Sequence, residues 1–184
     1  MRSIWAALWR YVDHPDPLVA ATNLIAVVVA WNQPFYPLYV YWSVSETIWP
    51  TYYAFLSTPL FLAVPLVARF DGRASRAMLP LVGIANTIVC TKVFGEATGT
   101  EVFLISCALL PALFFRRSER ALALALTALP FAVYYLLHGR YGTPMHIYAP
   151  EEAASFLTLN ALSAGTLTVF GGFLAVNAWT ASHR

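Results

Sequence analysis

The sequence predicts an all-α fold: a polytopic membrane bundle of six transmembrane helices, preceded by a short amphipathic helix at the membrane interface. Two observations support this prediction. Hydrophobic residues make up 59% of the 184 residues and charged residues only 11%, whereas soluble domains carry roughly 25% charged residues. Long apolar stretches also recur along the whole chain, and such stretches are typical of membrane-spanning helices.

The first segment, residues 1–16, is expected to lie along the membrane surface. Its apolar residues recur at helical spacing and two arginines are available for the polar side, as in interfacial amphipathic helices. The apolar residues are Trp5, Leu8, Trp9 and Val12, and the arginines are Arg2 and Arg10. The run His14–Pro17 ends this helix, because proline cannot continue one.

Six spans follow in a transmembrane domain, residues 17–179, and a short tail of residues 180–184 is expected after it. The expected spans are residues 18–42, 50–70, 77–94, 100–115, 121–138 and 155–179. Most approach the roughly 20 residues that cross a bilayer, although the fourth is short. Pro34 and Pro37 are expected to kink or unwind the second half of the first span.

The basic residues predict the orientation of the bundle. Under the six-span scheme, nine of the eleven lie on one side, namely Arg2, Arg10, Arg69, Arg73, Arg76, Arg116, Arg117, Arg120 and Arg184. The opposite side holds Glu46, Glu96, Glu101, Glu151 and Glu152. The positive-inside rule therefore predicts an integral protein of the inner (cytoplasmic) membrane with both termini cytoplasmic. The bilayer is the expected partner, and a net charge of +2 indicates no nucleic acid.

The sequence carries no pattern typical of an enzyme. It has no His-x-x-x-His or Glu-x-x-His pair, no Gly-x-Ser-x-Gly motif and no phosphate-binding loop. No histidine falls in the middle of a span, so no haem, other cofactor or metal is expected; the four are His14, His138, His146 and His183. Cys90 and Cys107 lie in apolar runs and are expected to act as small core residues.

The stretch between the third and fourth spans reads first as a tight turn between two helices. The lysine Lys92, the only one in the chain, lies at the end of one helix and Glu101 at the start of the next, where each charge complements the helix dipole. Gly95 and Gly99 supply the permissive backbone that a reversal needs. Thr100 is expected to cap the fourth helix.

A ligand site is the alternative interpretation of this turn. Lys92 is expected to form an ion pair with Glu101 or Glu96, which a simple turn explains. Yet an ionisable group below the lipid headgroups is a functional candidate by default. The sequence leaves both interpretations open and favours the turn.

Amide side chains form a second group of candidates. Asn32 and Gln33 precede Pro34, which leaves a backbone carbonyl without its helical partner, and Asn86 lies in the third span. Such residues usually form hydrogen bonds between helices. In the outer half of the bundle they are also placed to line a polar pocket with the charged turn. The candidate ligand-binding residues are therefore Lys92, Glu101, Asn32, Gln33 and Asn86.

The chain from Asn23 to Asn177 resembles a known group of membrane domains. The resemblance rests on the glycine turn, apolar span and arginine loop of "FGEATGTEVFLISCALLPALFFRRSERALALALTALPF". It is similar to the six-helix input domains of bacterial sensor histidine kinases and of adenylate or diguanylate cyclases. The resemblance implies a bacterial sensor in which a lipophilic or small-molecule signal binds within the bundle and is passed on through the last helix.

Two functions follow as hypotheses. The first is a non-catalytic, receptor-like module that binds a small or lipophilic ligand and signals through a membrane or cytoplasmic protein partner, since no kinase or cyclase domain follows Trp179. The second is an accessory subunit of a larger membrane complex. It is motivated by the small residues Ala161 and Gly165 of the sixth span, whose spacing suits close contact between helices.

Overall fold

The structure is a computed structural model that describes residues 2–182, with side chains from residue 5 onward. Within this range every regular element is a helix and no strand occurs. Met1, His183 and Arg184 lie outside the described residues, so the prediction that Arg184 lies on the basic side stays a prediction. Residues 180–182, expected to begin the tail, still belong to the last helix.

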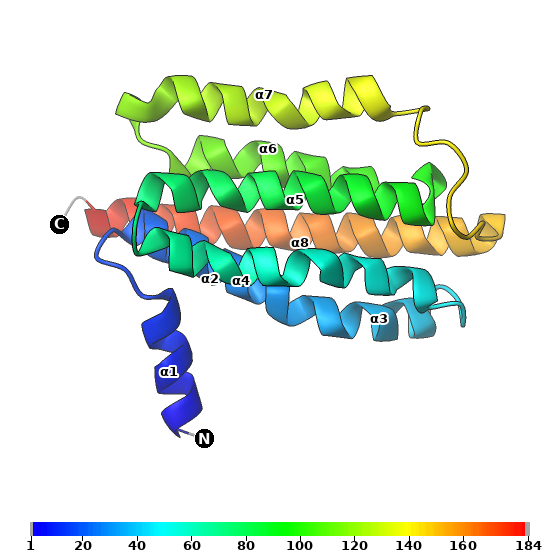
Figure 1. The fold of residues 1–184 in the computed structure, drawn as a ribbon, viewed down its shortest axis with the longest axis horizontal. Helices are drawn as coiled ribbons and strands as arrows, with labels where there is room; N and C mark the ends of the chain where they lie inside the picture. The colour runs from blue at the N-terminus through cyan, green and yellow to red at the C-terminus, as the bar shows by residue number, and fades with distance from the viewer. Residues whose placement is uncertain (1, 183–184) are drawn as a thin grey trace.

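From α2 to α8 the long helical segments run in alternating directions within one bundle, α3 prolongs α2, and α1 stands outside the bundle (Figure 1). The α-helices are α1 (Arg2–Val12), α2 (Pro17–Asn32), α3 (Tyr36–Ser43), α4 (Thr58–Ala68), α5 (Gly72–Phe94), α6 (Phe103–Phe114), α7 (Arg120–Leu137) and α8 (Pro150–Ser182). Five short 3₁₀ segments join or extend them: η1 (Gln33–Phe35), η2 (Trp49–Ser57), η3 (Glu96–Thr98), η4 (Thr100–Val102) and η5 (Arg117–Glu119).

Five helical segments are long and apolar enough to cross a membrane: Pro17–Ser43, Trp49–Ala68, Gly72–Phe94, Arg117–Leu137 and Pro150–Ser182. A further apolar segment, Thr100–Phe114, is shorter. It corresponds to the span that the sequence analysis also found to be short. The chain reverses direction between successive segments, so α8 ends at the same end of the bundle as α2 begins (Figure 1).

Proline chemistry interrupts the first long segment, as predicted. Asp16 caps α2 by accepting a hydrogen bond at Oδ1 from the backbone N–H of Leu18 (3.0 Å), and Pro17 occupies the first turn. The α-helix ends at Asn32, one 3₁₀ turn follows, and α3 resumes at Tyr36. Pro34 lacks the N–H that would continue the α-helical ladder, which explains the break.

The second long segment differs from the continuous α-helix that the sequence predicted. Its first nine residues form the 3₁₀ segment η2, and the α-helix α4 begins only at Thr58. Pro50 and Pro59 occupy the first turns of η2 and α4. A 3₁₀ helix rises about 2.0 Å per residue instead of 1.5 Å, so this segment is longer than an α-helix of the same residue count.

The turn between α5 and α6 depends on two glycines, as predicted. Gly95 has φ of 88° and Gly99 has φ of 67°, backbone angles that residues with a Cβ atom rarely adopt. The predicted cap is wrong: no side-chain cap is present at the start of α6, which begins at Phe103 after the 3₁₀ segment η4. Thr100 lies inside η4 with its hydroxyl buried against Thr98 Oγ1, 2.9 Å away.

Three apolar clusters hold the bundle together, the smallest of them built on Ile84, Leu104 and Cys107. One of the two larger clusters lies near the end where α2 begins and includes Leu18, Val64, Leu79 and Phe114. The other lies near the α5–α6 turn and is built on aromatic rings, with Phe94 and Phe156 stacked at 5.4 Å between centroids. α7 packs chiefly on α6 and leaves most of its surface exposed.

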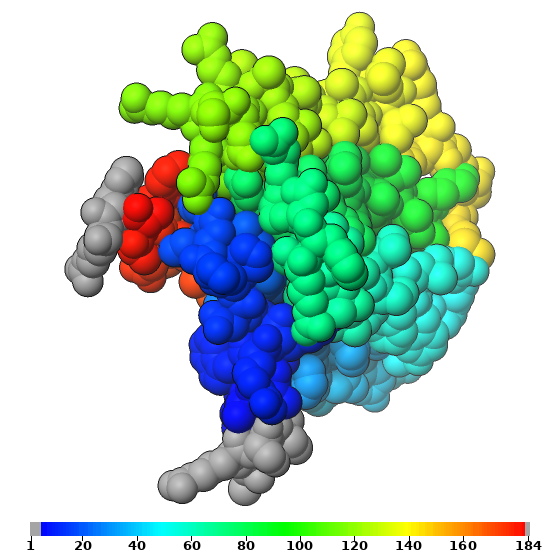
Figure 2. All heavy atoms as spheres, turned by 60° about the vertical axis from the view of Figure 1, so that its left-hand side comes forward, coloured from blue at the N-terminus to red at the C-terminus, as the bar shows by residue number. Residues whose placement is uncertain are grey.

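α1 stands apart from the other helices and projects from the bundle (Figures 1 and 2). It touches the bundle at Tyr11, whose hydroxyl donates to the carbonyl of Leu62 and whose ring lies under the guanidinium of Arg69. Trp5 and Trp9 are exposed. The helix therefore turns its two tryptophans away from the bundle, while Tyr11 faces it.

Candidate functional site

A cavity of about 640 Å³ lies inside the bundle. Residues from α2, η1, α3, η2, α4, α5, η4, α6 and α8 line it. The described lining residues include no Asp, Glu, Lys, Arg or His, so the wall is apolar with a few neutral polar groups. Both the size and this mixture are typical of small-molecule sites in proteins.

Small side chains at helical spacing leave room for this cavity. On α5 the lining residues include Gly83, Thr87 and Cys90, and on α6 they include Ser106 and Cys107. Residues three and four apart share one helix face, so Gly83, Thr87 and Cys90 form a stripe that faces the interior, and Ser106 and Cys107 follow the lining residue Phe103 by three and four positions. These are lining residues that the sequence analysis did not select, and the spacing of small residues is the signal that would have indicated them.

One wall of the cavity is a network of amides and hydroxyls. The Gln33 amide donates from Nε2 to the Ala54 carbonyl (3.0 Å) and to Ser57 Oγ (2.7 Å). Its Oε1 accepts from the Thr58 hydroxyl at 2.5 Å. Ser57 Oγ also lies 2.9 Å from Asn86 Oδ1. Gln33 is thus fully bonded and buried, and it joins the 3₁₀ break of the first segment to η2 and α5.

The other two predicted amides have free donors at the cavity. Asn86 Oδ1 accepts from Ser57 and from the Cys90 thiol (3.6 Å), while its Nδ2 has no hydrogen-bond partner among the described residues. Asn32 is exposed; its Oδ1 accepts from the Tyr39 hydroxyl at 3.2 Å, and none of the residues that the structure describes accepts from its Nδ2. Both residues line the cavity. Each therefore offers amide hydrogens to whatever occupies the space.

The cavity reaches the surface of the bundle between the first segment and α8. Trp31 and Leu162 line it and are 73% and 67% exposed. On one side of them α2 and α8 approach closely, since Ile25 Cδ1 lies 3.9 Å from the Cβ position of Gly171. On the other side Tyr36 donates a hydrogen bond of 2.8 Å to Asn160 Oδ1. These two contacts bound a lateral opening, which we call the α2–α8 window.

A buried hydrogen-bond chain connects the cavity to the α5–α6 turn. Asn160 of α8 is fully buried; it accepts from Tyr36 and donates from Nδ2 to the Thr98 carbonyl at 2.9 Å and to Thr100 Oγ1 at 3.4 Å. Tyr36 and Thr100 line the cavity. Two successive hydrogen bonds, from Tyr36 to Asn160 and from Asn160 to Thr98, therefore connect the cavity wall to the turn. The residue that makes both bonds, Asn160, belongs to α8.

Lys92 and Glu101 lie outside this cavity, against the loop between α7 and α8. The expected ion pair of Lys92 with Glu96 or Glu101 is absent among the described residues. Lys92 Nζ instead donates to the carbonyls of Tyr141 (2.7 Å) and Thr143 (2.9 Å). The structure therefore brings Asn32, Gln33 and Asn86 to one cavity and places the two charged candidates elsewhere.

The two glutamates of the turn also bind the α7–α8 loop. Glu101 Oε2 lies 2.7 Å from Nδ1 of His138, and Glu96 Oε1 accepts from the Gly139 N–H at 2.7 Å. The hydrogen bond to Glu101 raises the pKa of His138, which lies just beyond the end of α7. Lys92, Glu96 and Glu101 together fasten the loop to the turn, a role closer to the turn interpretation than to a ligand site.

Buried oxygens accompany these contacts. Thr91 Oγ1, Glu101 Oε1 and the Tyr141 hydroxyl are buried without a hydrogen bond of regular geometry. Burial and the nearby Glu101 carboxylate raise the pKa of Tyr141 to about 12, so its hydroxyl keeps its proton. The Tyr141 side chain therefore interacts with Glu101 as a neutral phenol.

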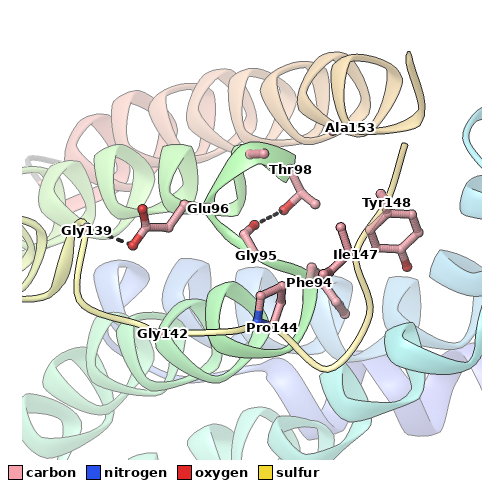
Figure 3. Close-up of a pocket in the computed structure, with 11 residues that line it drawn as sticks. Phe94, Gly95, Glu96, Thr98, Gly139, Gly142, Pro144, Ile147, Tyr148 and Ala153 are labelled. Carbon is pink, nitrogen blue, oxygen red and sulfur yellow. Dashed lines mark hydrogen bonds between the residues drawn. The ribbon is translucent and has the colours of Figure 1, made fainter. Parts of the chain in front are cut away.

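A smaller outer pocket of about 310 Å³ lies beside this loop (Figure 3). Pro144, Ile147 and Tyr148 of the loop face Phe94 across it, and Glu96 turns toward Gly139 at its edge (Figure 3). Phe94 lines this pocket and the central cavity alike. One aromatic ring thus separates the two spaces.

At the opposite end of the bundle the arginine loops form a buried ion pair that the sequence analysis did not foresee. Arg76 and Glu119 meet in two parallel contacts, Nη1–Oε2 at 2.7 Å and Nη2–Oε1 at 2.9 Å. Their side chains are only 5% and 8% exposed. Arg76 also donates to the Phe114 carbonyl at 2.9 Å. Arg76 therefore clamps α5 to the α6–α7 connection.

No protein-family model matches the chain, and no curated protein sequence matches it either. The cavity and its opening are consequently the observations from which a function is inferred.

Proposed function

We propose that this protein is a non-catalytic, receptor-like membrane module that binds a small lipophilic ligand in the central cavity and signals through a protein partner. One observation carries the proposal: a cavity of about 640 Å³ whose lining has no charged residue opens sideways through the α2–α8 window. A lateral, apolar opening favours a ligand that reaches the site from the bilayer. A site for a water-soluble ligand would instead favour an opening at an end of the bundle.

The proposal includes six membrane crossings and a surface-bound α1. Five segments meet the length and composition of a span, and Thr100–Phe114 is proposed as the sixth, because the chain reverses before and after it. α1 presents exposed tryptophans away from the bundle, as a helix in the lipid interface does. The domain limits proposed from the sequence, 1–16, 17–179 and 180–184, follow this scheme.

The arginine distribution supports the proposed orientation, with both termini cytoplasmic in the inner membrane of a bacterium. Arg73 and Arg76 lie in the first two turns of α5, and Arg116 and Arg117 lie on the α6–α7 connection, all at the end of the bundle where α2 begins. Loops rich in arginine stay in the cytoplasm. Lys92 and the α7–α8 loop then face outward.

Cysteine labelling tests this orientation. Cys90 and Cys107 are buried, so the wild-type protein supplies a low background. We expect Ile147→Cys in the outer loop to react with a membrane-impermeant maleimide in intact cells, and Ser118→Cys to react only after the cells are lysed. Both positions are exposed, so equal accessibility of the two in intact cells would contradict the orientation.

The hydrogen-bond chain through Asn160 supports signalling through α8. A ligand in the cavity lies beside Tyr36 and Thr100, which Asn160 ties to the last helix. A ligand that displaces either bond biases the position of α8, and a partner that binds α8 reads this bias. The family that the chain resembles also implies output through the last helix.

Bound small molecules test the function itself. We expect extracts of the protein, purified gently from its native membrane, to contain a lipophilic compound that raises the Tm when added back. Leu162→Trp fills the window and should abolish both the co-purification of the compound and the rise in Tm. Val176→Trp, also on α8 and 65% exposed but away from the cavity, should change neither. A protein that carries and binds no such compound would contradict the proposal.

An accessory role in a larger complex is the second candidate. The Cβ positions of Gly165 and Gly172 on α8 meet no atom within 4 Å, and the surrounding surface is apolar. Such a surface suits a second membrane helix. Gentle purification at native expression distinguishes the two candidates, since an accessory subunit retains a stoichiometric partner without any ligand.

A further inference from the structure

We propose that the ligand of the central cavity is an uncharged amphiphile, which enters through the α2–α8 window and places a hydrogen-bond-accepting oxygen against Asn86 and Asn32. This inference rests on the proposed function, because it assumes that the cavity is a ligand site. It adds the chemical class of the ligand, its route and the orientation in which it binds.

The lining excludes a charged headgroup. None of the described lining residues is acidic or basic, so a buried carboxylate, phosphate or ammonium group would find no counterion. Charges buried without a partner carry a large desolvation penalty. Lys92, the basic residue at the end of α5, is held by two carbonyls of the α7–α8 loop and does not line the cavity.

The hydrogen-bond inventory of the wall defines the polar group of the ligand. The hydroxyls of Thr87, Ser163 and Ser106 each donate to a backbone carbonyl, and Gln33 has both partners it needs. Among the described lining residues, the groups left over are the Nδ2 amides of Asn86 and Asn32, whose oxygens already accept bonds from the protein, together with the exposed Thr166 hydroxyl and Trp31 indole N–H. Free donors require an acceptor, so the ligand supplies a hydroxyl, carbonyl or ether oxygen.

The α2–α8 window defines the apolar part of the ligand. It extends over eleven residue steps of α8, from Asn160 to Gly171, which is about 16 Å at 1.5 Å per residue, and over the facing stretch from Ile25 of α2 through η1 to Tyr36. Trp31 and Leu162 are its large exposed lining side chains, and the polar Asn32 and Thr166 are exposed as well. A hydrocarbon chain that passes between Trp31 and Leu162 remains in contact with lipid, while the oxygen reaches the Asn32 amide at the opening and the Asn86 amide further inside.

Photolabelling with matched probes tests the inference. Three diazirine-bearing probes share one long chain and end in a hydroxyl, a carboxylate or a methyl group. In liposomes, at a pH that ionises the carboxylate, we expect the alcohol to label peptides of α5 and α8 that line the cavity at least tenfold more strongly than the carboxylate. Excess unlabelled alcohol should suppress this labelling.

Two variants locate the oxygen and the route. Asn86→Leu keeps the side-chain size and removes the amide, and Ser57 retains the Ala54 carbonyl 2.9 Å away as its acceptor. We expect about tenfold weaker labelling by the alcohol, the value of one or two hydrogen bonds, and unchanged labelling by the methyl-ended probe. Leu162→Trp should reduce labelling by both probes, whereas Val176→Trp should leave both as in wild type.

The outcomes separate the inference from the function beneath it. Labelling of the cavity by the carboxylate as strong as by the alcohol would overturn the uncharged class and leave the cavity as the site. Labelling by the alcohol that is unaffected by Asn86→Leu, in a variant with an unchanged Tm, would overturn the placement of the oxygen. Failure of all three probes to label the cavity would overturn the proposed function itself.

Discussion

The Tyr36 hydroxyl donates a hydrogen bond of 2.8 Å to Asn160 Oδ1, a residue 124 positions further along the chain, and this bond joins α3 to α8. Asn160 is fully buried, and its Nδ2 donates to the Thr98 carbonyl and to the Thr100 hydroxyl oxygen. This residue of α8 therefore connects the end of the 3₁₀ break to the α5–α6 turn. The same bond closes one end of the α2–α8 window.

Removing the Asn160 amide should therefore destabilise the protein markedly. Asn160→Leu leaves the Tyr36 hydroxyl and the Thr98 carbonyl without their partner. Unsatisfied buried groups cost about 1–3 kcal/mol each, so we expect a loss of about 2–4 kcal/mol in the free energy of unfolding in detergent micelles. The exposed amide of Asn177 on the same helix gives a control, and Asn177→Leu should change stability by less than about 0.5 kcal/mol.

Gly99 should tolerate no side chain. Its φ of 67° is strained for other residues, and an added Cβ would lie 2.1 Å from Leu157 Cδ1. We expect Gly99→Ala to lower the free energy of unfolding by at least about 1 kcal/mol. Gly172→Ala, in helix α8 with open space at the Cβ position, should have the opposite or no effect. Equal effects of the two substitutions on the Tm would contradict this account of the turn.

The pair of His138 and Glu101 should make stability depend on pH. The hydrogen bond to Glu101 raises the folded-state pKa of His138 above its ordinary value of 6.5. A raised pKa means that the charged histidine stabilises the fold fully below pH 6.5, and that this contribution disappears as the pH rises through the folded pKa. We expect the Tm difference between wild type and His138→Gln to shrink from about pH 5 to about pH 9. A constant difference would show that the pair does not titrate as described.

Arg76 should be far more important for stability than its neighbour Arg73. Arg76→Met leaves the buried Glu119 without its bidentate partner, which costs about 3–5 kcal/mol in comparable pairs. Replacing both residues, as in Arg76→Met with Glu119→Leu, should recover most of this loss. Arg73 is 64% exposed, so Arg73→Ala should cost less than about 1 kcal/mol. Chemical unfolding measures all three, and a double variant as unstable as Arg76→Met would contradict the role of the pair.

The helices and their breaks could be predicted because local chemistry determines them. Proline at position 34 predicted the 3₁₀ break, and Gly95 and Gly99 predicted the reversal between α5 and α6. The expected spans agree with the helical segments to within a few residues except at residues 77 and 155, since α5 and α8 each begin five residues earlier, at Gly72 and Pro150. The cap supplied by Asp71 explains the earlier start of α5, because its Oδ1 accepts from the Arg73 N–H at 2.7 Å.

The grouping of the site residues could be predicted only in part. Asn86 and Lys92 are six residues apart, which rotates their side chains by about 240° around α5, so they face different spaces. This angle was available from the sequence. The partners of Lys92 could not be predicted from the sequence. They are two backbone carbonyls of the α7–α8 loop, and every residue has a backbone carbonyl, so no residue type marks these positions. The buried pairing of Arg76 with Glu119 likewise depends on the packing of distant loops.

The central claim is that the cavity is a lipid-accessible ligand site, and the structure of the protein in a lipid nanodisc tests it most directly. We predict elongated density that passes between Trp31 and Leu162 and ends within hydrogen-bond distance of the Asn86 amide. A bundle in which Trp31 packs against Leu162, with the helices closed over an empty or collapsed interior, would contradict it.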